Sequence, residues 1–147
     1  EIHILKPALN LFQMYVMFYF GEHESVVKMI ESNEDGYFEK AVPGIAGLVV
    51  NAFHSALSCI SMARQTGKSK YRKMAKKFTN KIKTWVEKGN PNVIQYKALL
   101  ESEWSAMRNK KHEAIHNFEV AILMAGRRGL LQDRAVAHER CSDFYMS

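Results

Sequence analysis

The sequence predicts an all-α fold in which antiparallel helical hairpins stack as an irregular solenoid of about seven helices. Apolar residues recur at intervals of three and four almost throughout, and no window of five or more residues alternates apolar and polar as a half-buried strand would. Glycine, proline and asparagine separate the periodic segments. The 147 residues are 47% hydrophobic and 24% charged, which excludes a disordered chain and a disulfide-stapled miniprotein. We expect one helical domain over residues 1–147.

The first two helices are expected over residues 7–20 and 22–32. Pro7 suits the start of a helix, and Gly21 breaks the apolar run that ends at Phe20. Residues 14–20 are apolar on every side of this helix, so we expect neighbouring helices to cover it. The cluster at residues 33–36 is a loop.

A long third helix is expected over residues 43–65, beginning at Pro43 and stopped by Gly67. One of its faces is apolar, and the other carries Gly, Ser, Asn, His and Cys, which permit close helix approach. The fourth helix, residues 69–88, buries one stripe while lysines fill the remaining surface. The stripe consists of Tyr71, Met74, Ala75, Phe78, Ile82, Trp85 and Val86.

Three further helices complete the chain. Asn90 is expected to cap the fifth, with Pro91 at its first position and its end near Arg108. The sixth runs from about Lys110 until glycines close it, and the seventh covers residues 132–146. Five aromatic residues on apolar stripes are expected in the core: Phe12, Phe18, Trp85, Trp104 and Phe144.

The spacing within the sixth helix indicates a repeat architecture. Ala114, Phe118 and Ala121 follow the 0, 4, 7 pattern of the second helix of a tetratricopeptide repeat, where small residues let paired helices close. A degenerate copy of the turn-and-helix pattern occupies residues 20–30, about 88 positions earlier. This spacing favours an irregular solenoid over a regular array.

The run from Trp85 to Phe144 resembles the tetratricopeptide-like region of large multidomain signalling proteins. The resemblance lies in the Trp then Asn-Pro break, in residues 96–103 and 113–122, and in residues 129–145; before residue 85 it is looser. It implies a scaffold that lies between a serine/threonine-kinase-like domain with an AAA-type ATPase and a GAF sensor with a histidine kinase. Ser102 and Ser105 depart from the small apolar residues common there. No catalytic residue is transferred by these packing motifs.

The sequence His112-Glu113-Ala114-Ile115-His116 is a literal HExxH, the spacing that binds zinc on a helix with the glutamate as general base. Glu139 offers a third ligand on paper. Three features oppose a metallopeptidase: small Ala114 follows the glutamate, Lys110 and Lys111 precede the first histidine, and no strand is available to bind a peptide. We expect both histidines on the outer surface, with no metal and no cofactor.

Net charge is concentrated in one segment. The chain carries 21 Lys and Arg against 15 Asp and Glu, a net of +6, but residues 68–88 alone hold nine cations and one acid, a local +8. The expected interaction surface comprises Lys70, Lys73, Lys76, Lys77, Lys81 and Lys83. It could bind nucleic acid or an acidic partner, although the excess of lysine over arginine favours diffuse electrostatics. The simpler interpretation is a solvated face whose lysine stems cover apolar surface.

Two further patterns concern location. Residues 41–63 are uncharged and long enough to span a bilayer, but their Pro, Gly, Asn, His and Ser residues lower the hydropathy, so no span is expected. Cys59 and Cys141 form neither a CxxC nor a disulfide framework, which favours reduced thiols in the cytoplasm.

These patterns lead to a functional hypothesis. We expect a non-enzymatic helical-repeat scaffold that binds other proteins within a larger cytoplasmic signal-transduction protein, of which this chain is a piece because it opens on Glu1 without a methionine. The apolar residues at its start (Ile2, Ile4, Leu5) and finish (Phe144, Tyr145, Met146) are expected to pack on further structure. A basic-helix binding module is the alternative, and a zinc peptidase a remote one.

Overall fold

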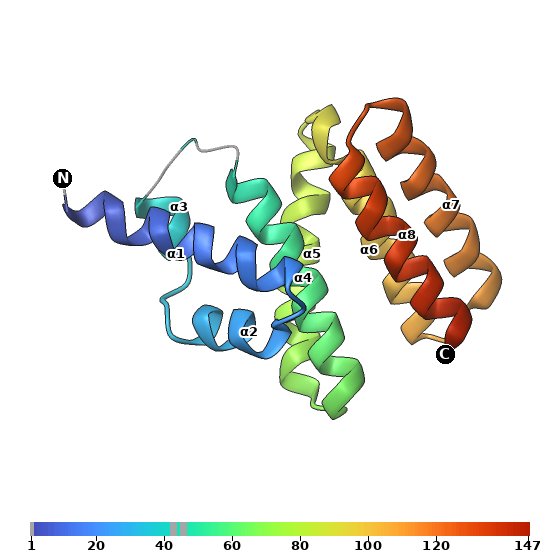
Figure 1. Ribbon diagram of the computed structural model, residues 1–147, viewed down its shortest axis with the longest axis horizontal. Coiled ribbons are helices and arrows are strands. Elements are labelled where there is room, and N and C mark those ends of the chain that lie inside the picture. Colours follow the sequence, from blue (N-terminus) through green and yellow to red (C-terminus); the bar gives the residue numbers. More distant parts are fainter. Residues whose placement is uncertain (1, 42–43, 45–46) are drawn as a thin grey trace. The chain divides into compact units, whose positions relative to one another are not determined.

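The structure is a computed structural model that describes residues 2–41, 44 and 47–147 (Figure 1). Within these residues there are eight α-helices, one short 3-10 helix and no strand, which confirms the all-α prediction. The chain divides into two compact units, Glu1–Lys81 and Ile82–Ser147, here called the N-terminal unit and the C-terminal unit.

The N-terminal unit contains α1 (Ile2–Tyr19), α2 (His23–Glu31), α3 (Tyr37–Ala41), α4 (Gly47–Thr66) and the larger part of α5 (Ser69–Glu87). Helix α1 contacts α2, α3 and α4, and α2 also contacts α4. Gly21 and Gly67 end α1 and α4 with φ values of +73° and +69°, a left-handed conformation that costs glycine little.

Helix α4 is the centre of this unit. Every residue from position 52 to position 63 is buried, including Ser55 and Ser58, which are fully buried. The small side chains on the reverse face of α4 allow this, because they let neighbouring backbone approach closely. The expected start at Pro43 and Ile45, a residue of the expected apolar face, lie outside the described residues, and the described helix begins at Gly47.

The start of α1 differs from the sequence prediction. The helix begins at Ile2 rather than at Pro7, which lies inside α1 and is buried. Proline in a helix interior removes one hydrogen bond to the residue four positions earlier. Burial of the ring among α1's neighbours offsets part of that loss.

The prediction that α1 is covered by neighbours was wrong for its outer side. Met14 and Phe18 face inward at 1% and 8% exposure, whereas Phe12 is 65% exposed and Phe20 79%. Assigning Phe12 to the core was therefore also wrong. A helix that is apolar all round can present one face to the core and leave the opposite face open for another molecule.

Helix α3 is not among the seven helices that the sequence pattern predicts. It is five residues long and buries one large side chain, Phe38, at 8% exposure. A segment of that length contains barely more than one helical turn, so it shows no periodicity that sequence analysis can detect.

The C-terminal unit contains a 3-10 turn (Pro91–Val93), α6 (Ile94–Met107), α7 (Lys111–Arg127) and α8 (Leu131–Met146), after the end of α5. Helices α6 and α7 form a tightly packed hairpin, and α8 packs against α7 and less extensively against α6. The Asn90 side chain accepts a hydrogen bond from the backbone N–H of Asn92 at 3.0 Å, so the expected cap is present, although the first turn is 3-10 rather than α.

Within the described residues, no helix combines the length and the apolar character that crossing a bilayer requires.

Candidate functional site

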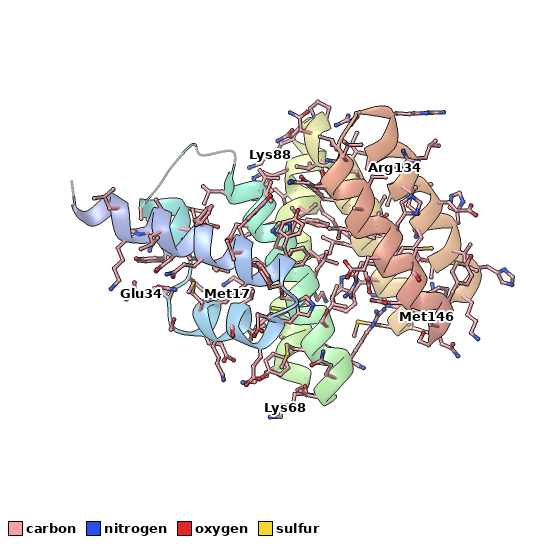
Figure 2. The ribbon with its side chains drawn as sticks, viewed as in Figure 1. Met17, Glu34, Lys68, Lys88, Arg134 and Met146 are labelled. Atoms are coloured by element: carbon pink, nitrogen blue, oxygen red, sulfur yellow. The ribbon has the colours of Figure 1, made fainter. Side chains whose placement is uncertain are left out.

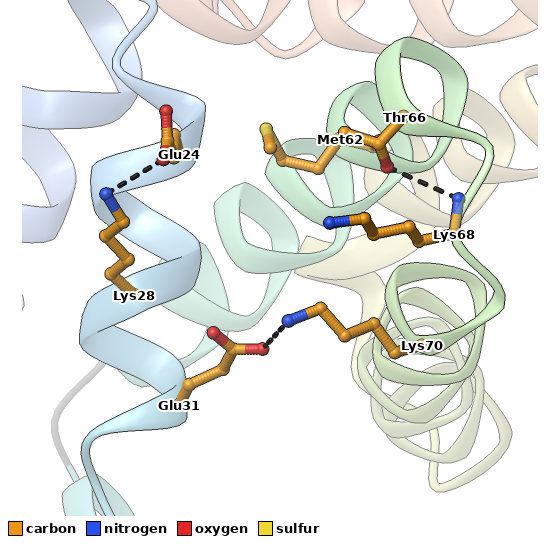
Figure 3. A network of polar contacts seen from close by, with 7 residues as sticks. All are labelled: Glu24, Lys28, Glu31, Met62, Thr66, Lys68 and Lys70. Atoms are coloured by element: carbon orange, nitrogen blue, oxygen red, sulfur yellow. Dashed lines mark hydrogen bonds and ion pairs between the residues drawn. The ribbon is translucent and has the colours of Figure 1, made fainter.

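The lysines of the expected interaction surface lie on α5, between Lys68 and Lys88, which flank the helix (Figure 2). Three of them form ion pairs within the N-terminal unit. Lys70 Nζ lies 2.9 Å from Glu31 Oε1 at the end of α2 (Figure 3). Lys77 pairs with Asp35, and Lys81 pairs with Glu39 of α3. Half of the six expected lysines therefore already face a carboxylate of the N-terminal unit.

The three carboxylates follow one another at four-residue intervals, with Glu31 at the end of α2, Asp35 in the connecting loop and Glu39 in α3. The hydrogen bond and charge of Lys77 lower the pKa of Asp35. For Glu39, burial acts to raise the pKa, but the hydrogen bond from Lys81 and further favourable interactions outweigh it, so the net shift is downward. We call Lys70, Lys77 and Lys81 with their three carboxylates the acid–lysine clamp.

The remaining three lysines are less engaged. Lys73 and Lys76 are exposed, and Lys83 of the C-terminal unit lies 4.0 Å from Glu101. The positive surface left for another molecule is thus smaller than the count of lysines indicated. Binding of nucleic acid or an external acidic partner by α5 stays a prediction.

Replacing Lys81 with methionine is expected to lower the free energy of unfolding by about 0.5–1 kcal/mol, because it leaves partly buried Glu39 without its lysine. Lys81→Met keeps the apolar stem, so little packing is lost. Urea denaturation at low and high salt measures the effect, which we expect to shrink as salt screens the pair in the native protein. The control is Lys76→Met, which replaces an exposed lysine on the same helix. A destabilisation by Lys81→Met that does not change with salt concentration would contradict the acid–lysine clamp.

The HExxH motif lies on α7 with its two histidines and Glu113 all exposed. Glu113 accepts a hydrogen bond from Ser105 Oγ at 2.8 Å and another from Lys110 Nζ at 3.1 Å. These bonds lower its pKa. In the part of the chain that the structure describes, no three His, Cys, Asp or Glu side chains gather as a metal site. Through its hydrogen bond with Ser105, Glu113 therefore links the start of α7 to the end of α6.

The residues with tetratricopeptide-like spacing lie inside the C-terminal unit. Ala114 and Phe118 are fully buried, and Ala121 is 1% exposed. Trp104 and Trp85 are only partly buried. Phe118 reaches Phe144 of α8, with ring centroids 5.6 Å apart, so this aromatic side chain of α7 packs against α8.

The first feature that the sequence did not reveal is a buried ion pair in the C-terminal unit. Glu103 of α6 is fully buried, and Arg140 Nε of α8 donates a hydrogen bond to its Oε1 at 2.5 Å. The pair joins two helices 37 positions apart in sequence. A glutamate that occurs among polar neighbours in a helix pattern gives no sign of such a partner.

A second missed feature is an apolar face on α1. It consists of five large side chains of α1 and of Phe20, the residue directly after the helix, with exposure from 37% to 79%: Leu5, Leu9, Phe12, Val16, Tyr19 and Phe20. We call this set the α1 apolar face. The steps between its first five members are four, three, four and three residues, the spacing of a coiled-coil seam.

The α8 terminus is also exposed, with Met146 76% accessible (Figure 2).

The third missed residue is His54 of α4, which is 2% exposed. Its ring stacks on Phe18 with centroids 3.9 Å apart and planes 8° apart, and the Tyr19 ring lies nearly perpendicular to it, at 87°, with centroids 5.2 Å apart. Neither ring nitrogen has a hydrogen-bond partner. Burial lowers the pKa of His54 to about 3, so the imidazole is neutral at physiological pH.

Both cysteines are free thiols. Cys59 is fully buried in α4, and burial raises its pKa to about 12, with a smaller contribution from Glu31. Burial also raises the pKa of Cys141 in α8. Neither thiol is activated as a nucleophile, because the reactive form is the thiolate.

Comparisons with protein-family models, curated proteins and solved structures found no match to this chain.

Proposed function

We propose that this chain is a non-catalytic helical scaffold that assembles through the α1 apolar face, with the α1 helix of a second copy as the occupant. The single observation that carries the proposal is the exposure of this face: its five members within α1 form one continuous helical stripe, Phe20 follows directly after the helix, and Phe12 and Phe20 alone are 65% and 79% exposed. Exposed apolar stripes of this kind mark sites where another protein binds.

The spacing of the stripe selects a helix as the occupant. Steps of four and three residues average 3.5, which keeps a seam of side chains facing a partner helix that supercoils around it. Leu9 and Val16 then occupy one type of seam position, while Leu5, Phe12 and Tyr19 occupy the other. A strand or a flat surface would meet only part of such a stripe.

The charge of α1 favours a second copy. The helix contains one Lys or Arg, Lys6, and no Asp or Glu. Two copies therefore meet with almost no like-charge repulsion. A different protein would need complementary charges beside the seam for selectivity, and α1 offers almost none. Symmetric pairing of identical chains is also the commonest form of oligomer.

Sedimentation equilibrium of the full chain tests the proposal. We expect a reversible dimer for the native sequence and a monomer for the double variant Leu9→Glu, Phe12→Glu, because the glutamates would be buried across the seam without partners. Both positions are exposed in the single chain, so the fold should survive, and circular dichroism checks this.

The matched control is Leu131→Glu, which places the same substitution at an apolar residue of α8 that is 75% exposed. We expect this variant to remain a dimer. A native chain that sediments as a monomer at every accessible concentration would overturn the second copy as occupant. Loss of the dimer in Leu131→Glu as well would place the contact outside α1.

The wider setting stays part of the proposal. We infer a tetratricopeptide-like solenoid within a multidomain signalling protein, on the resemblance of residues 85–144 and on the buried Ala114, Phe118 and Ala121 of α7. The non-catalytic assignment is supported by Glu113, the glutamate of the HExxH motif. Its carboxylate oxygens accept hydrogen bonds from Ser105 and Lys110. The sequence that flanks this chain in its parent protein tests the setting directly.

A further inference from the structure

Helix α5 carries two rows of cations within the N-terminal unit, and the chain itself pairs one of them with carboxylates. The first row is the lysines of the acid–lysine clamp, whose steps of seven and four residues keep them on one side of the helix. The second row lies on the neighbouring side, is exposed, and consists of Arg72, Lys73 and Lys76. The clamp carboxylates all belong to residues 31–39, which we call the acidic strap.

The clamp is an ordered ladder of ion pairs. From its start to its end the acidic strap meets Lys70, Lys77 and Lys81 in that order, with one carboxylate for each lysine. The first pair spans 2.9 Å between Glu31 of α2 and Lys70 (Figure 3). The lysine row therefore accepts a series of carboxylates rather than one isolated charge, and the acidic strap shows which chemistry fits this side of α5.

The middle of the acidic strap is held to α5 by charge more than by packing. Of residues 31–39, all of which the structure describes, Phe38 is the one that is buried. The side chain of Asp35 is 88% exposed although it pairs with Lys77. A cavity of about 40 Å³, which has room for water, is lined by residues of the strap and by Lys77 and Lys81. Exposed ion pairs contribute little to stability, so an external anion can compete with the strap.

We propose that the lysine row of the clamp is a docking surface for an acidic protein segment whose carboxylates lie about one helical turn apart, and that the acidic strap occupies this surface until the partner displaces it. A four-residue interval places acidic side chains on one side of a helix, as the strap places its own. Lysine binds a carboxylate as a point charge and lacks the forked geometry with which arginine recognises phosphate. The exposed second row adds long-range attraction for the same partner.

Fluorescence anisotropy of the full chain with a labelled peptide of Glu-Ala-Ala-Ala repeats, at low ionic strength, tests the surface. The triple variant Glu31→Gln, Asp35→Asn, Glu39→Gln keeps the size of the strap side chains and removes their charge. We expect it to bind the peptide at least about tenfold more tightly than the native chain, because the lysine row no longer has an internal competitor. Equal affinities of the two proteins, or no binding to either, would overturn the proposal.

The matched control removes the same number of carboxylates from outside the clamp, with Glu22→Gln, Glu34→Gln and Glu119→Gln combined in one chain. We expect its affinity to stay within about threefold of the native value, because only the overall charge has changed. A gain equal to that of the clamp variant would attribute the effect to net charge and contradict the proposal. Circular dichroism verifies that each variant is folded.

A second pair of variants locates the bound peptide on α5. Added to the triple variant, Lys77→Met with Lys81→Met should remove the tenfold gain, whereas Lys73→Met with Lys76→Met should retain most of it. Both pairs remove two lysines from the same helix. Equal losses from the two rows would indicate diffuse attraction to α5 and would overturn the docking surface.

Hydrogen exchange of the native chain measures the displacement itself. Saturating peptide should speed the exchange of amides in the acidic strap and leave those of α7 unchanged, because only the strap is released. Binding without faster exchange in the strap would contradict displacement. Tighter binding of a single-stranded oligonucleotide of equal charge than of the peptide would make nucleic acid the partner and overturn the acidic protein segment.

Discussion

Replacement of Arg140 by methionine is expected to lower the free energy of unfolding of the C-terminal unit by about 3–5 kcal/mol. Glu103 is fully buried and accepts a 2.5 Å hydrogen bond from Arg140 Nε, and the arginine side chain is itself only 11% exposed. Without the guanidinium, the carboxylate remains in the interior and must either stay charged or take up a proton. Either alternative destabilises the folded state by more than the van der Waals contacts of the methionine side chain stabilise it.

The double variant Glu103→Leu, Arg140→Met is expected to recover most of the loss, because removing both members leaves no uncompensated charge. Urea denaturation of the full chain measures all variants, with Arg134→Met as the control for loss of an exposed arginine from α8. A destabilisation by Arg140→Met no larger than that control contradicts the buried pair.

The second large effect is expected in acid. The pKa of His54 is about 3 in the folded chain and near 6.5 when the residue is unfolded. Below pH 6.5 the unfolded state binds a proton that the native state does not, so stability falls as pH decreases. The slope should approach about 1.4 kcal/mol per pH unit between pH 6 and the folded pKa, which would add to several kcal/mol over the full window.

Denaturation at a series of pH values, compared between the native chain and His54→Phe, measures this contribution. The carboxylates with lowered pKa, such as Asp35 and Glu39, give stability that is present above their unfolded pKa and lost as pH falls through their folded pKa. Their effect therefore belongs to more acidic solutions than the onset of the His54 effect. His116→Phe, at an exposed histidine, is the control, and identical pH profiles for the native chain and His54→Phe would contradict it.

The helices of this protein were predictable because their apolar residues recur at helical spacing and their ends carry recognisable signals. Gly67 ends α4, and Asn90 caps the turn before α6. The start of α1 was not predictable, since Pro7 is usually found at the first helical position and lies inside this helix instead. Helix α3 is too short to show a period.

The candidate sites depended on contacts between distant residues, which a single sequence does not display. Lys81 and Glu39 are 42 positions apart, and the lysine pattern alone indicated an empty positive surface rather than a paired one. The α1 apolar face was hidden for a related reason. Periodicity shows that a residue is apolar and on which side it lies, but not whether another helix covers that side, as Phe12 illustrates.

The unbroken burial of α4 also determines how this unit opens. Because positions 52–63 are buried on all sides, their amide protons can exchange with solvent only when the surrounding helices separate together. The ends of α5 and the exposed turn that follows α1 at Phe20 can fray without that event. We therefore expect helix α4 to be the slowest-exchanging and most protease-resistant segment of its unit.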